Sequence, residues 1–496
     1  MLKAALTWLL VAFVLAGAIP LLTASYEYLL VALHRLRNHY GKCRPWYPRT
    51  AIVIAAWNEE AVIGTTIDRL MGLDYPPQAL RVVVVDDAST DGTPGVLEAK
   101  MAQYPGRVIH LRRDKGGEGK AAALNHGLAY ILGNSWMQAL LIGDADPIFE
   151  PAALQWMTRH LADPSIGAVT AYIKEGSSPA NFLNRFIAYE YATGQAAARR
   201  GQNVLGAIQC LAGGAQLHSR ANIEAIGGRI DSTTLAEDTV TTIETQRTGR
   251  KVVFEPHATV WAEEPGGIAA LWKQRLRWAR GNVQITLRYR HLWFHRQPNN
   301  GLGGITFGLL WFGILLQPVF MLTGSVSLLT LYFVNASLAW RAFDVLWLAN
   351  ALTYLFMTSF TLMIDPQTAR KAWVEAFLFV GVVNFTIMAA AVVTTPMHAL
   401  AVTFLGLFGI TLTKAWVVGS VVFLYVWLAG AMGVAYLAKA AEPRWGGRVT
   451  SRVLLYLSGY GPLMCAVTLT SYIKELTGAE ARWDKTEKTG KIVAPA

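Results

Sequence analysis

The stretch RVVVVDDASTDG, residues 81–92, decides the fold that we expect for this chain. Its run of consecutive valines is typical of a strand that is covered on both faces, as in a parallel sheet. Asp86 and Asp87 follow the strand directly, and Pro94 soon afterwards suits the first turn of a helix. The stretch therefore predicts a strand, an acidic loop and a helix in succession.

The same alternation of apolar and helix-forming runs continues around this stretch. Apolar runs predict strands at 51–56, 81–85, 107–111, 139–142 and 167–172, and the segments between them predict helices at 61–73, 120–132 and 151–161, with another opening at Thr93. Strands that alternate with helices indicate a mostly parallel α/β sheet. Ligands of such sheets bind at the carboxyl ends of the strands.

Adjacent carboxylates lie at the carboxyl end of the second predicted strand. Placing Asp86 and Asp87 together at a strand end is costly unless a ligand or a metal uses their charges. Both could accept hydrogen bonds from a base or a ribose. Ser89 and Asp91, further along the loop, could instead cap the following helix.

A second acidic pair follows the strand predicted at 139–142. Asp144 and Asp146 form an Asp-x-Asp motif, whose hard oxygen atoms suit Mg or Mn, and such a cation can hold a diphosphate. An ordinary acidic turn is the alternative for so short a motif. Its position at a second strand end favours the metal site.

Two further segments carry charge at helix starts. The glycine-rich stretch KGGEGK ends at Lys120, where a helix begins, and this suits an anion site, although a flexible loop is an equal alternative. It is not a P-loop. Glu237 and Asp238 open a helix that runs to Thr248, where the helix dipole alone would favour acidic side chains.

The composition places this α/β domain in a membrane protein. Hydrophobic residues make up 53% of the chain and charged residues only 16%, below the roughly 25% that is usual in soluble proteins. The net charge of +11 lies next to apolar segments rather than in a basic tail, which favours anionic membrane lipids over nucleic acid as partner. The 3 cysteines are widely separated and predict neither a disulfide framework nor a metal site.

Apolar segments flank the domain on both sides. The first, up to residue 33, is expected to be a retained span with a kink at Pro20. Candidate spans follow at 302–334, 343–364, 373–393, 417–437 and 453–469. The segment 302–334 could be an interfacial helix plus a span or a hairpin, 397–412 could be interfacial, and GYGP at 459–462 should break the last helix and make it re-entrant or interfacial. We expect about five to six membrane helices, with the basic loops and tail in the cytoplasm.

The stretch KQRLRWARGN, residues 273–282, is basic and aromatic and directly precedes these spans. Positive charge at the cytoplasmic membrane surface would explain it, and so would a binding surface. On a helix, Gln274, Arg277 and Trp278 share one face, while Arg275 lies to the side and could meet lipid headgroups. Both explanations can therefore hold at once.

Several motifs occur along the chain in one order: AAWNEE at 55–60, VVVVDDASTDGT, GKAAALNHG, LIGDAD, LAEDT and QRLRW. Over about residues 46–285 they resemble the processive, membrane-embedded glycosyltransferases of family 2. These include cellulose, chitin and hyaluronan synthases, and the layout is most similar to that of bacterial poly-N-acetylglucosamine synthases. The resemblance implies an α/β GT-A domain with a mostly parallel, nucleotide-sugar-binding sheet, between an N-terminal transmembrane helix and a C-terminal α-helical multi-span membrane domain.

The resemblance also implies roles for particular residues. The residues that it assigns to the nucleotide sugar are Asn58, Glu60, Asp86, Asp87, Lys120, Asp144, Gln274 and Arg277. It assigns a divalent cation, Mg or Mn, to Asp144 and Asp146, with Asp146 preferred. Asp238 would be the general base beside Glu237, and Trp278 would contact the acceptor. Ala236 stands where the family motif has threonine, which puts only fine positioning in doubt.

These assignments predict an inverting, metal-dependent transfer of a sugar from a nucleotide sugar, such as a UDP-sugar, to a growing polysaccharide that the membrane domain exports. A non-processive transferase that adds one sugar to a membrane lipid is the alternative, and a non-enzymatic homologue is disfavoured because the expected acids are present. The predicted parts are an anchor at 1–40, the GT-A domain at 41–265, interface helices at 266–300, the membrane domain at 301–472 and a tail at 473–496. We expect a multi-pass protein of the bacterial inner membrane with a cytoplasmic catalytic domain, and the resemblance is compatible with accessory subunits.

Overall fold

The computed structural model describes residues 1–37, 39–392, 414–443, 447–480, 490 and 492. The stretch 397–412 and most of the tail predicted at 473–496 lie outside the described residues. The chain forms two compact units, which we call the sheet unit and the helical unit. The sheet unit comprises Glu27–Gly266, Arg280–Gly308 and Ala479–Ala496, and the helical unit comprises Met1–Tyr26, Gly267–Ala279 and Leu309–Gly478.

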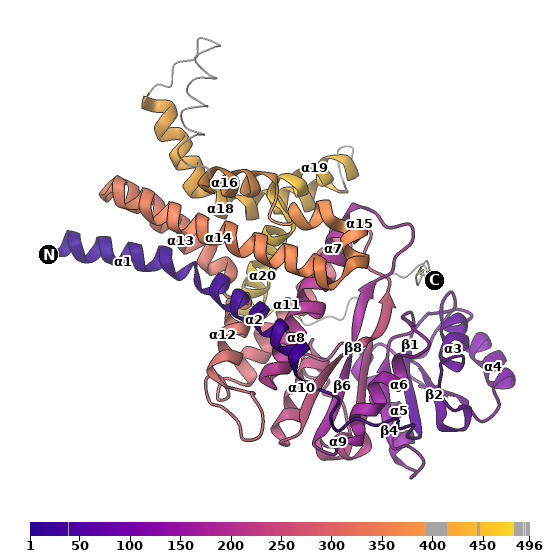
Figure 1. Cartoon of the computed structure of the whole chain (residues 1–496). Helices are drawn as coiled ribbons and strands as arrows, with labels where there is room; N and C mark the ends of the chain where they lie inside the picture. Colours follow the sequence, from indigo (N-terminus) through magenta and orange to yellow (C-terminus); the bar gives the residue numbers. More distant parts are fainter. Residues whose placement is uncertain (38, 393–413, 444–446, 481–489, 491, 493–496) are drawn as a thin grey trace. The chain divides into compact units, whose positions relative to one another are not determined.

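An eight-stranded sheet with the order β3-β2-β1-β4-β7-β6-β8-β5 forms the sheet unit (Figure 1). The strands are β1 Thr50–Ala56, β2 Leu80–Asp86, β3 Val108–Arg112, β4 Ala139–Gly143, β5 Ile148–Phe149, β6 Ile166–Glu175, β7 Ala215–Ser219 and β8 Lys251–Ala262. Strands β3, β2, β1 and β4 pair in parallel, as do β6 and β8, while β7 is antiparallel to both of its neighbours and β5 to β8. The mostly parallel α/β sheet is therefore confirmed.

Each predicted strand is present, whereas β5, β7 and β8 are not evident from apolar runs. Strand β7 buries two polar side chains, Gln216 and His218, so its sequence does not read as apolar. Strand β8 contains Glu255 and Pro256, and its pairing with β6 shifts register after Glu255. Their polar side chains have partners outside the strands, such as Asn222 for His218 and His160 for Glu255, and local composition does not show these partners.

Helices alternate with the strands as predicted. They are α3 Ile63–Met71, α4 Thr93–Gln103, α5 Lys120–Leu132, α6 Ala153–Thr158, α7 Phe182–Tyr191, α8 Ala198–Leu205, α9 Arg220–Ala225 and α10 Glu237–Arg247. Helix α5 packs on β1 and β2. A Cβ at Gly127 of α5 would lie 2.7 Å from a methyl of Val53 and 2.8 Å from one of Val85. The missing side chain thus lets α5 lie close to the sheet and fixes where its first residue, Lys120, comes to lie.

The helical unit contains apolar helices long enough to cross a membrane. Its elements include α1 Leu2–Ala16, α13 Gln317–Val334, α14 Ala336–Ile364, α15 Pro366–Phe377, α16 Val382–Val392, α18 Lys414–Ala441, α19 Arg448–Ser458 and α20 Tyr460–Leu476. Helices α2 Ile19–Leu36, α11 Ile268–Arg288 and α12 Ile305–Leu315 have residues in both units. By length and composition, the described residues hold 4 candidate spans, or up to 6 if each of two bent helix pairs is one span.

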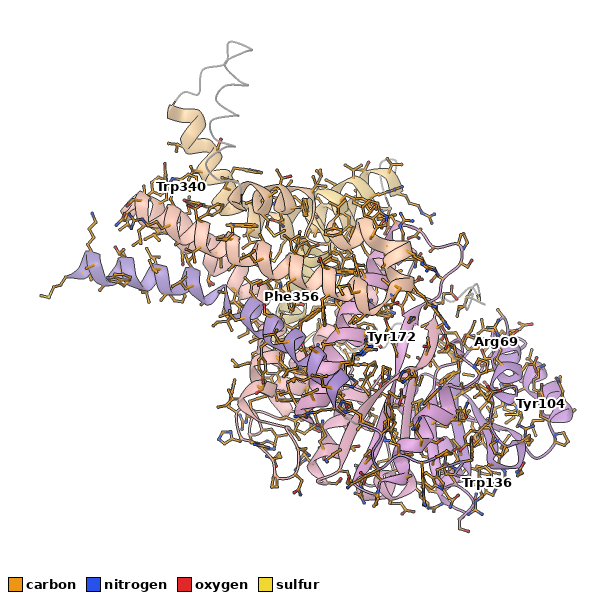
Figure 2. All side chains as sticks on the ribbon, in the orientation of Figure 1. Arg69, Tyr104, Trp136, Tyr172, Trp340 and Phe356 are labelled. Carbon is orange, nitrogen blue, oxygen red and sulfur yellow. The ribbon has the colours of Figure 1, made fainter. Side chains whose placement is uncertain are left out.

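The N-terminal candidate span, Leu2–Leu36, changes from α1 to α2 just before Pro20, where a kink is expected. Further along, helix α13 buries Leu328 and Leu331 against Phe343 and Trp347 of α14. Side chains such as Trp340 and Phe356 project along the length of α14 (Figure 2). The segment predicted at 302–334 holds the short apolar helix α12 followed by the candidate span α13, which matches the alternative of a short helix plus a span.

Two breaks interrupt the later spans. The predicted break in the last span is present, since α19 and α20 meet at Gly459 with a bend of 97°. The candidate span predicted at 373–393 is not one straight helix, because α15 and α16 are bent by 79° around a break that ends at Gly381. Both glycines have positive φ, and a Cβ on Gly381 would come within 2.5 Å of the backbone at Ser458. The two breaks thus pack backbone to backbone, which a single glycine in an apolar run does not reveal.

Candidate active site

The loops that follow β1 and β2 are fastened to each other. The Asn58 amide donates to the Ser89 hydroxyl at 2.9 Å, and the Thr90 amide donates to Oδ1 of Asn58 at 2.8 Å. Oε2 of Glu60 accepts from the Gly92 amide at 3.0 Å. Asn58 and Glu60, both predicted to bind the donor, therefore hold the two loops together at the strand ends.

The neighbouring Asp91 accepts hydrogen bonds from the amides of Thr93 at 3.0 Å and Glu60 at 3.3 Å. It therefore stabilises the turn into α4, as the capping alternative suggested. Ser89 does not cap that helix, because its hydroxyl accepts from Asn58 in the opposite loop.

Asp86 and Asp87 are compensated by two arginines at the end of β3. Asp86 is fully buried, and its carboxylate accepts from the Ser89 amide at 2.8 Å and from Nη1 of Arg112 at 2.6 Å. Asp87 forms an ion pair with Arg113 and accepts from the Gly117 amide at 3.2 Å. Side chains and amides of the protein itself thus compensate the charges of both carboxylates.

Sequence reasoning missed Arg112 and Arg113. The available signal was the pair of arginines directly after the strand predicted at 107–111, because the parallel register of β2 and β3 places Arg112 opposite Asp86. Arg113 also pairs with Glu118 in the glycine-rich loop. Burial opposes the charge of Arg113, but hydrogen bonds with Asp87 and Glu118 raise its pKa.

Lys120 connects the Asp-x-Asp motif with the acidic start of α10. Its Nζ lies 2.5 Å from Oδ1 of Asp144, 3.1 Å from the carbonyl oxygen of Gly213 and 3.9 Å from Oε1 of Glu237. Burial opposes the charge, but Asp144 and Glu237 raise the pKa of Lys120. The lysine therefore stays protonated at neutral pH and balances the acids around it.

Asp238, at the first turn of α10, lies within the field of the same lysine. Its Oδ1 accepts a hydrogen bond from the Thr239 amide at 2.7 Å. Burial raises the pKa of Asp238 above its ordinary value, while Lys120 acts in the opposite direction. A carboxylate with a raised pKa is a better proton acceptor than an ordinary one, provided that it is ionised.

Two adjacent glycines before β7, Gly213 and Gly214, lie beside the carboxylates of Asp238 and Asp144. A Cβ on Gly213 would lie 3.1 Å from Oδ2 of Asp238, and one on Gly214 would lie 2.7 Å from Oδ2 of Asp144. The loop that contains these glycines is held to α10 by a hydrogen bond, which the Leu211 amide donates to the Thr242 hydroxyl at 2.8 Å. The predicted metal motif and the predicted base can thus share one site because neither glycine has a side chain.

The donor set fits a divalent cation that a substrate would help to hold. No group of three or more His, Cys, Asp or Glu side chains forms a metal cluster among the described residues. Mg usually takes one or two carboxylates from a protein and completes its shell with water and phosphate oxygens. Asp144, whose side chain is 41% exposed, and Asp146 offer such hard oxygen ligands. A complete protein cage is not required.

Helix α11 carries the remaining predicted residues, Gln274, Arg277 and Trp278, in the helical unit. The prediction that Arg275 faces lipid headgroups is wrong. Arg275 is buried, donates to Oε1 of Gln274 at 2.5 Å, and has its guanidinium 4.0 Å from the ring centroid of Trp278. The guanidinium of Arg275 therefore packs against the ring of Trp278, although the two residues were expected on different faces of the helix.

The start of α11 is held by the end of α18. Oε1 of Glu442 accepts from the Ile268 amide at 2.8 Å, and Oε2 accepts from the Ala269 amide at 2.6 Å. A carboxylate at a helix N-terminus is favoured by the helix dipole. Nearby, Nζ of Lys439 lies 4.4 Å from the ring centroid of Trp272. Helix α11 is thus fixed at its first turn within the helical unit.

Two curated relatives resemble this chain in sequence. The beta-monoglucosyldiacylglycerol synthase of Synechocystis is 34% identical over 254 residues, which are 51% of each chain. The poly-beta-1,6-N-acetyl-D-glucosamine synthase of Staphylococcus epidermidis is 27% identical over 241 residues, which are 48% of this chain and 55% of the relative. The chain thus matches only about half the length of either relative.

A solved structure and a family model agree with the fold. The mannosyltransferase PcManGT of Pyrobaculum calidifontis, in complex with GDP-Man and Mn2+, has a TM-score of 0.53 and 22% sequence identity, and the match covers 73% of this chain and 99% of that one. The family model described as glycosyltransferase like family 2 matches residues 48–281. Residues 48–281 are therefore similar to the family 2 glycosyltransferases and have the GT-A fold, and the chain also holds apolar helices long enough to cross a membrane.

Proposed function

We propose that this glycosyltransferase moves a sugar, with inversion and with the help of a divalent cation, from a nucleotide sugar to a growing polysaccharide. The observation that carries the proposal is the cluster around Lys120, which joins Asp144, Glu237 and the partly buried Asp238. An acid that binds the donor and the cation (Asp144), a fixed positive charge (Lys120) and a proton acceptor (Asp238) in one site are what such a transfer requires.

The chemistry follows from where charge develops. The acceptor hydroxyl loses its proton as it attacks the anomeric carbon, and Asp238 would accept that proton. A single displacement from the face opposite the diphosphate inverts the anomeric centre. Asp144 and Asp146 would hold the cation, which when bound stabilises negative charge on the diphosphate. Lys120 adds a fixed positive charge on the same side of the site.

The remaining assignments belong to the same proposal. Asp86 and Asp87 would support the nucleotide through the loops that they hold, together with Asn58 and Glu60. Gln274 and Arg277 of α11 would contact the donor, and Trp278 would lie under the acceptor sugar. Residues 41–265 would act at the cytoplasmic face of a bacterial inner membrane, with 266–300 at its surface and 301–472 exporting the product.

A lipid acceptor is the second candidate, because the more identical of the two relatives is a glycolipid synthase. The two candidates differ in the product. Full-length protein in lipid nanodiscs would be incubated with a panel of radiolabelled nucleotide sugars, and the products would be sized after lipid extraction. A long, water-soluble polymer supports the polysaccharide, whereas a lipid carrying one sugar rejects it in favour of the second candidate.

Removing divalent metal tests the proposed cofactor. Chelation with EDTA should abolish transfer, and adding Mg or Mn should restore it. Asp146→Asn should raise the metal concentration needed for half-maximal activity, because one hard oxygen ligand is weakened. Full activity in EDTA would remove the metal from the mechanism.

A further inference from the structure

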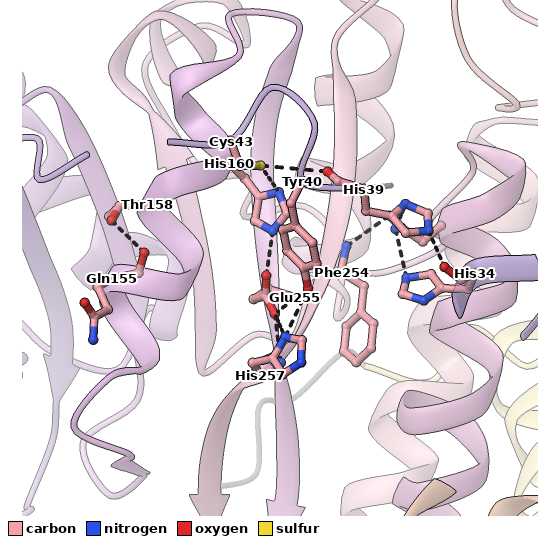
Figure 3. Close-up of polar contacts among 11 residues, drawn as sticks. His34, His39, Tyr40, Cys43, Gln155, Thr158, His160, Phe254, Glu255 and His257 are labelled. Carbon is pink, nitrogen blue, oxygen red and sulfur yellow. Dashed lines mark hydrogen bonds and ion pairs between the residues drawn. The ribbon is translucent and has the colours of Figure 1, made fainter. Parts of the chain in front are cut away.

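A cluster of polar side chains lies in the sheet unit apart from every residue predicted to bind the donor. We call it the Cys43 cluster, and its members are Tyr40, Cys43, His160, Glu255 and His257 (Figure 3). Tyr40 and Cys43 belong to the segment between α2 and β1, His160 follows α6, and the other two lie on β8. The sequence brings these residues from three separate regions, so their spacing predicts no site.

The core of the cluster is a thiol, an imidazole and a carboxylate in line. Sγ of Cys43 lies 3.3 Å from Nδ1 of His160, and Nε2 of the same ring lies 2.7 Å from Oε2 of Glu255. Figure 3 shows the imidazole between the sulfur and the carboxylate. A base that is oriented by a third group and touches a nucleophile is the arrangement that activates cysteine and serine nucleophiles.

Glu255 fixes the orientation of the ring. It is fully buried, and Oε1 accepts hydrogen bonds from the Tyr40 hydroxyl at 3.1 Å and from the His257 amide at 2.8 Å. Since Oε2 accepts from Nε2–H of His160, the neutral ring has its lone pair at Nδ1, facing the thiol. His160 can therefore take the proton of Cys43, and the resulting imidazolium is stabilised by the carboxylate.

The charge balance of the cluster favours an ionised Glu255 beside a protonated His160. Burial opposes the ionisation of Glu255, yet hydrogen bonds from His160 and His257 lower its pKa to about 2. Burial likewise opposes the imidazolium, but hydrogen bonds with Cys43 and Glu255 raise the pKa of His160 to about 9. Arg159 has its guanidinium 4.8 Å from the Tyr40 ring centroid and adds positive charge on that side.

The other cysteines lack these features. Cys210 has its sulfur 3.2 Å from the Thr239 hydroxyl and 3.0 Å from the Leu211 carbonyl oxygen, and burial raises the pKa of its thiol. Cys465 is buried in α20. Cys43 and Cys210 are both partly exposed, so a small reagent can reach either, but Cys43 contacts an imidazole and Cys210 a hydroxyl and a carbonyl oxygen. The chain thus carries its own comparison thiols.

We propose that Cys43 is an activated thiol and a modification site for soft electrophiles, including peroxides, with His160 as its base and Glu255 as the positioning residue. With a peroxide, the sulfur attacks one oxygen, the S–O bond forms and the O–O bond breaks. His160 gives the proton that it took from the thiol to the leaving oxygen. The sulfur is oxidised by two electrons to a sulfenic acid, and hydrogen peroxide is reduced to water.

The first test uses the unmodified full-length protein in nanodiscs. Iodoacetamide would be added at pH 7 in the presence of glutathione, and the adducts on each cysteine peptide would be followed by mass spectrometry over time. Cys43 should react at least as fast as glutathione despite being partly buried, and at least about tenfold faster than Cys210. A rate below that of glutathione would overturn the proposal without any variant being made.

The second test assigns the activation to the imidazole and the carboxylate. His160→Gln and Glu255→Gln should each slow alkylation of Cys43 by about tenfold or more, whereas His291→Gln, an exposed histidine of the same unit, should not. Hydrogen peroxide followed by dimedone should label Cys43 in the unmodified protein and in the His291 variant only. Unchanged labelling in folded His160→Gln protein, judged by its thermal denaturation midpoint, would show that the cluster is merely structural.

Discussion

Lys120 is the residue whose charge links the predicted parts of the active site. Its Nζ contacts Asp144 and lies 3.9 Å from Glu237, and its field opposes the effect of burial on Asp238. Sequence reasoning assigned Lys120 to an anionic ligand. The contacts instead place it among the enzyme's own carboxylates, which gives it a role before the donor arrives.

Asp238→Asn should lower kcat by about 10²–10⁴-fold, because the amide cannot accept the proton of the acceptor hydroxyl. The isosteric amide keeps the hydrogen bond from the Thr239 amide, so donor affinity should be retained. Single-turnover rates together with titration of the nucleotide sugar separate the two effects. Unchanged turnover would reject Asp238 as the base.

The pH dependence follows from the same residue. Burial raises the pKa of Asp238, and only its ionised form can act as base. Activity should therefore fall as pH decreases through this raised pKa, above the pH at which an ordinary aspartate protonates. Lys120→Met removes the charge that opposes the shift, so the acid limb of kcat/KM should move to higher pH.

Lys115→Met is the matched control for Lys120→Met, since Lys115 is exposed in the same glycine-rich loop. Its profile should coincide with that of the unmodified enzyme. An acid limb that stays in place in Lys120→Met would show that the lysine does not act on Asp238.

At the scale of elements, the position of Lys120 depends on how closely α5 packs on the sheet. Gly127→Ala would place a methyl within 2.7 Å of Val53 and 2.8 Å of Val85. Overpacking of this kind costs about 1–3 kcal/mol and shifts the helix. We expect a lower denaturation midpoint and a lower kcat, because Lys120 moves away from Asp144.

Gly95→Ala in α4 is the comparison for this change. A Cβ at Gly95 meets nothing within 4 Å, so that variant should keep both stability and activity. If Gly127→Ala lowered the midpoint but left kcat unchanged, the packing of α5 would not control the active site.

The elements also show how far sequence reasoning reaches. Apolar runs such as AIVIAA and RVVVV predict their strands because burial on both faces demands such runs. Strand β8 was not predicted, because Glu255 interrupts its apolar pattern, and the partners of that carboxylate include Tyr40 and His160 from distant segments. The arginine partners of Asp86 and Asp87 were missed for the same reason: their pairing depends on strand register, which local composition does not encode.

At the scale of the whole molecule, α11 has residues in both units. Its first turn is held by Glu442 of the helical unit, and beyond Ala279 it belongs to the sheet unit. There the Gln284 side chain accepts a hydrogen bond at 3.0 Å from the Leu235 amide, close to Glu237 and Asp238 in sequence. Trp278 is the residue of this helix proposed to contact the acceptor, so product length is the quantity that tests it.

Trp278→Ala should shorten the product more than it slows the first transfer. Trp278 is 39% exposed and would lose the ring on which an acceptor sugar can lie, while Lys120 and the acids of the sheet unit are untouched. Arg275→Ala should have the same direction of effect, because its guanidinium stacks on that ring. Trp373→Ala removes an equally large indole that is 59% exposed on α15 and should leave product length unchanged. The measurements are the chain length of the product by gel electrophoresis and the initial rate of nucleotide release. Polymer of normal length from Trp278→Ala would show that this ring does not belong to the acceptor site.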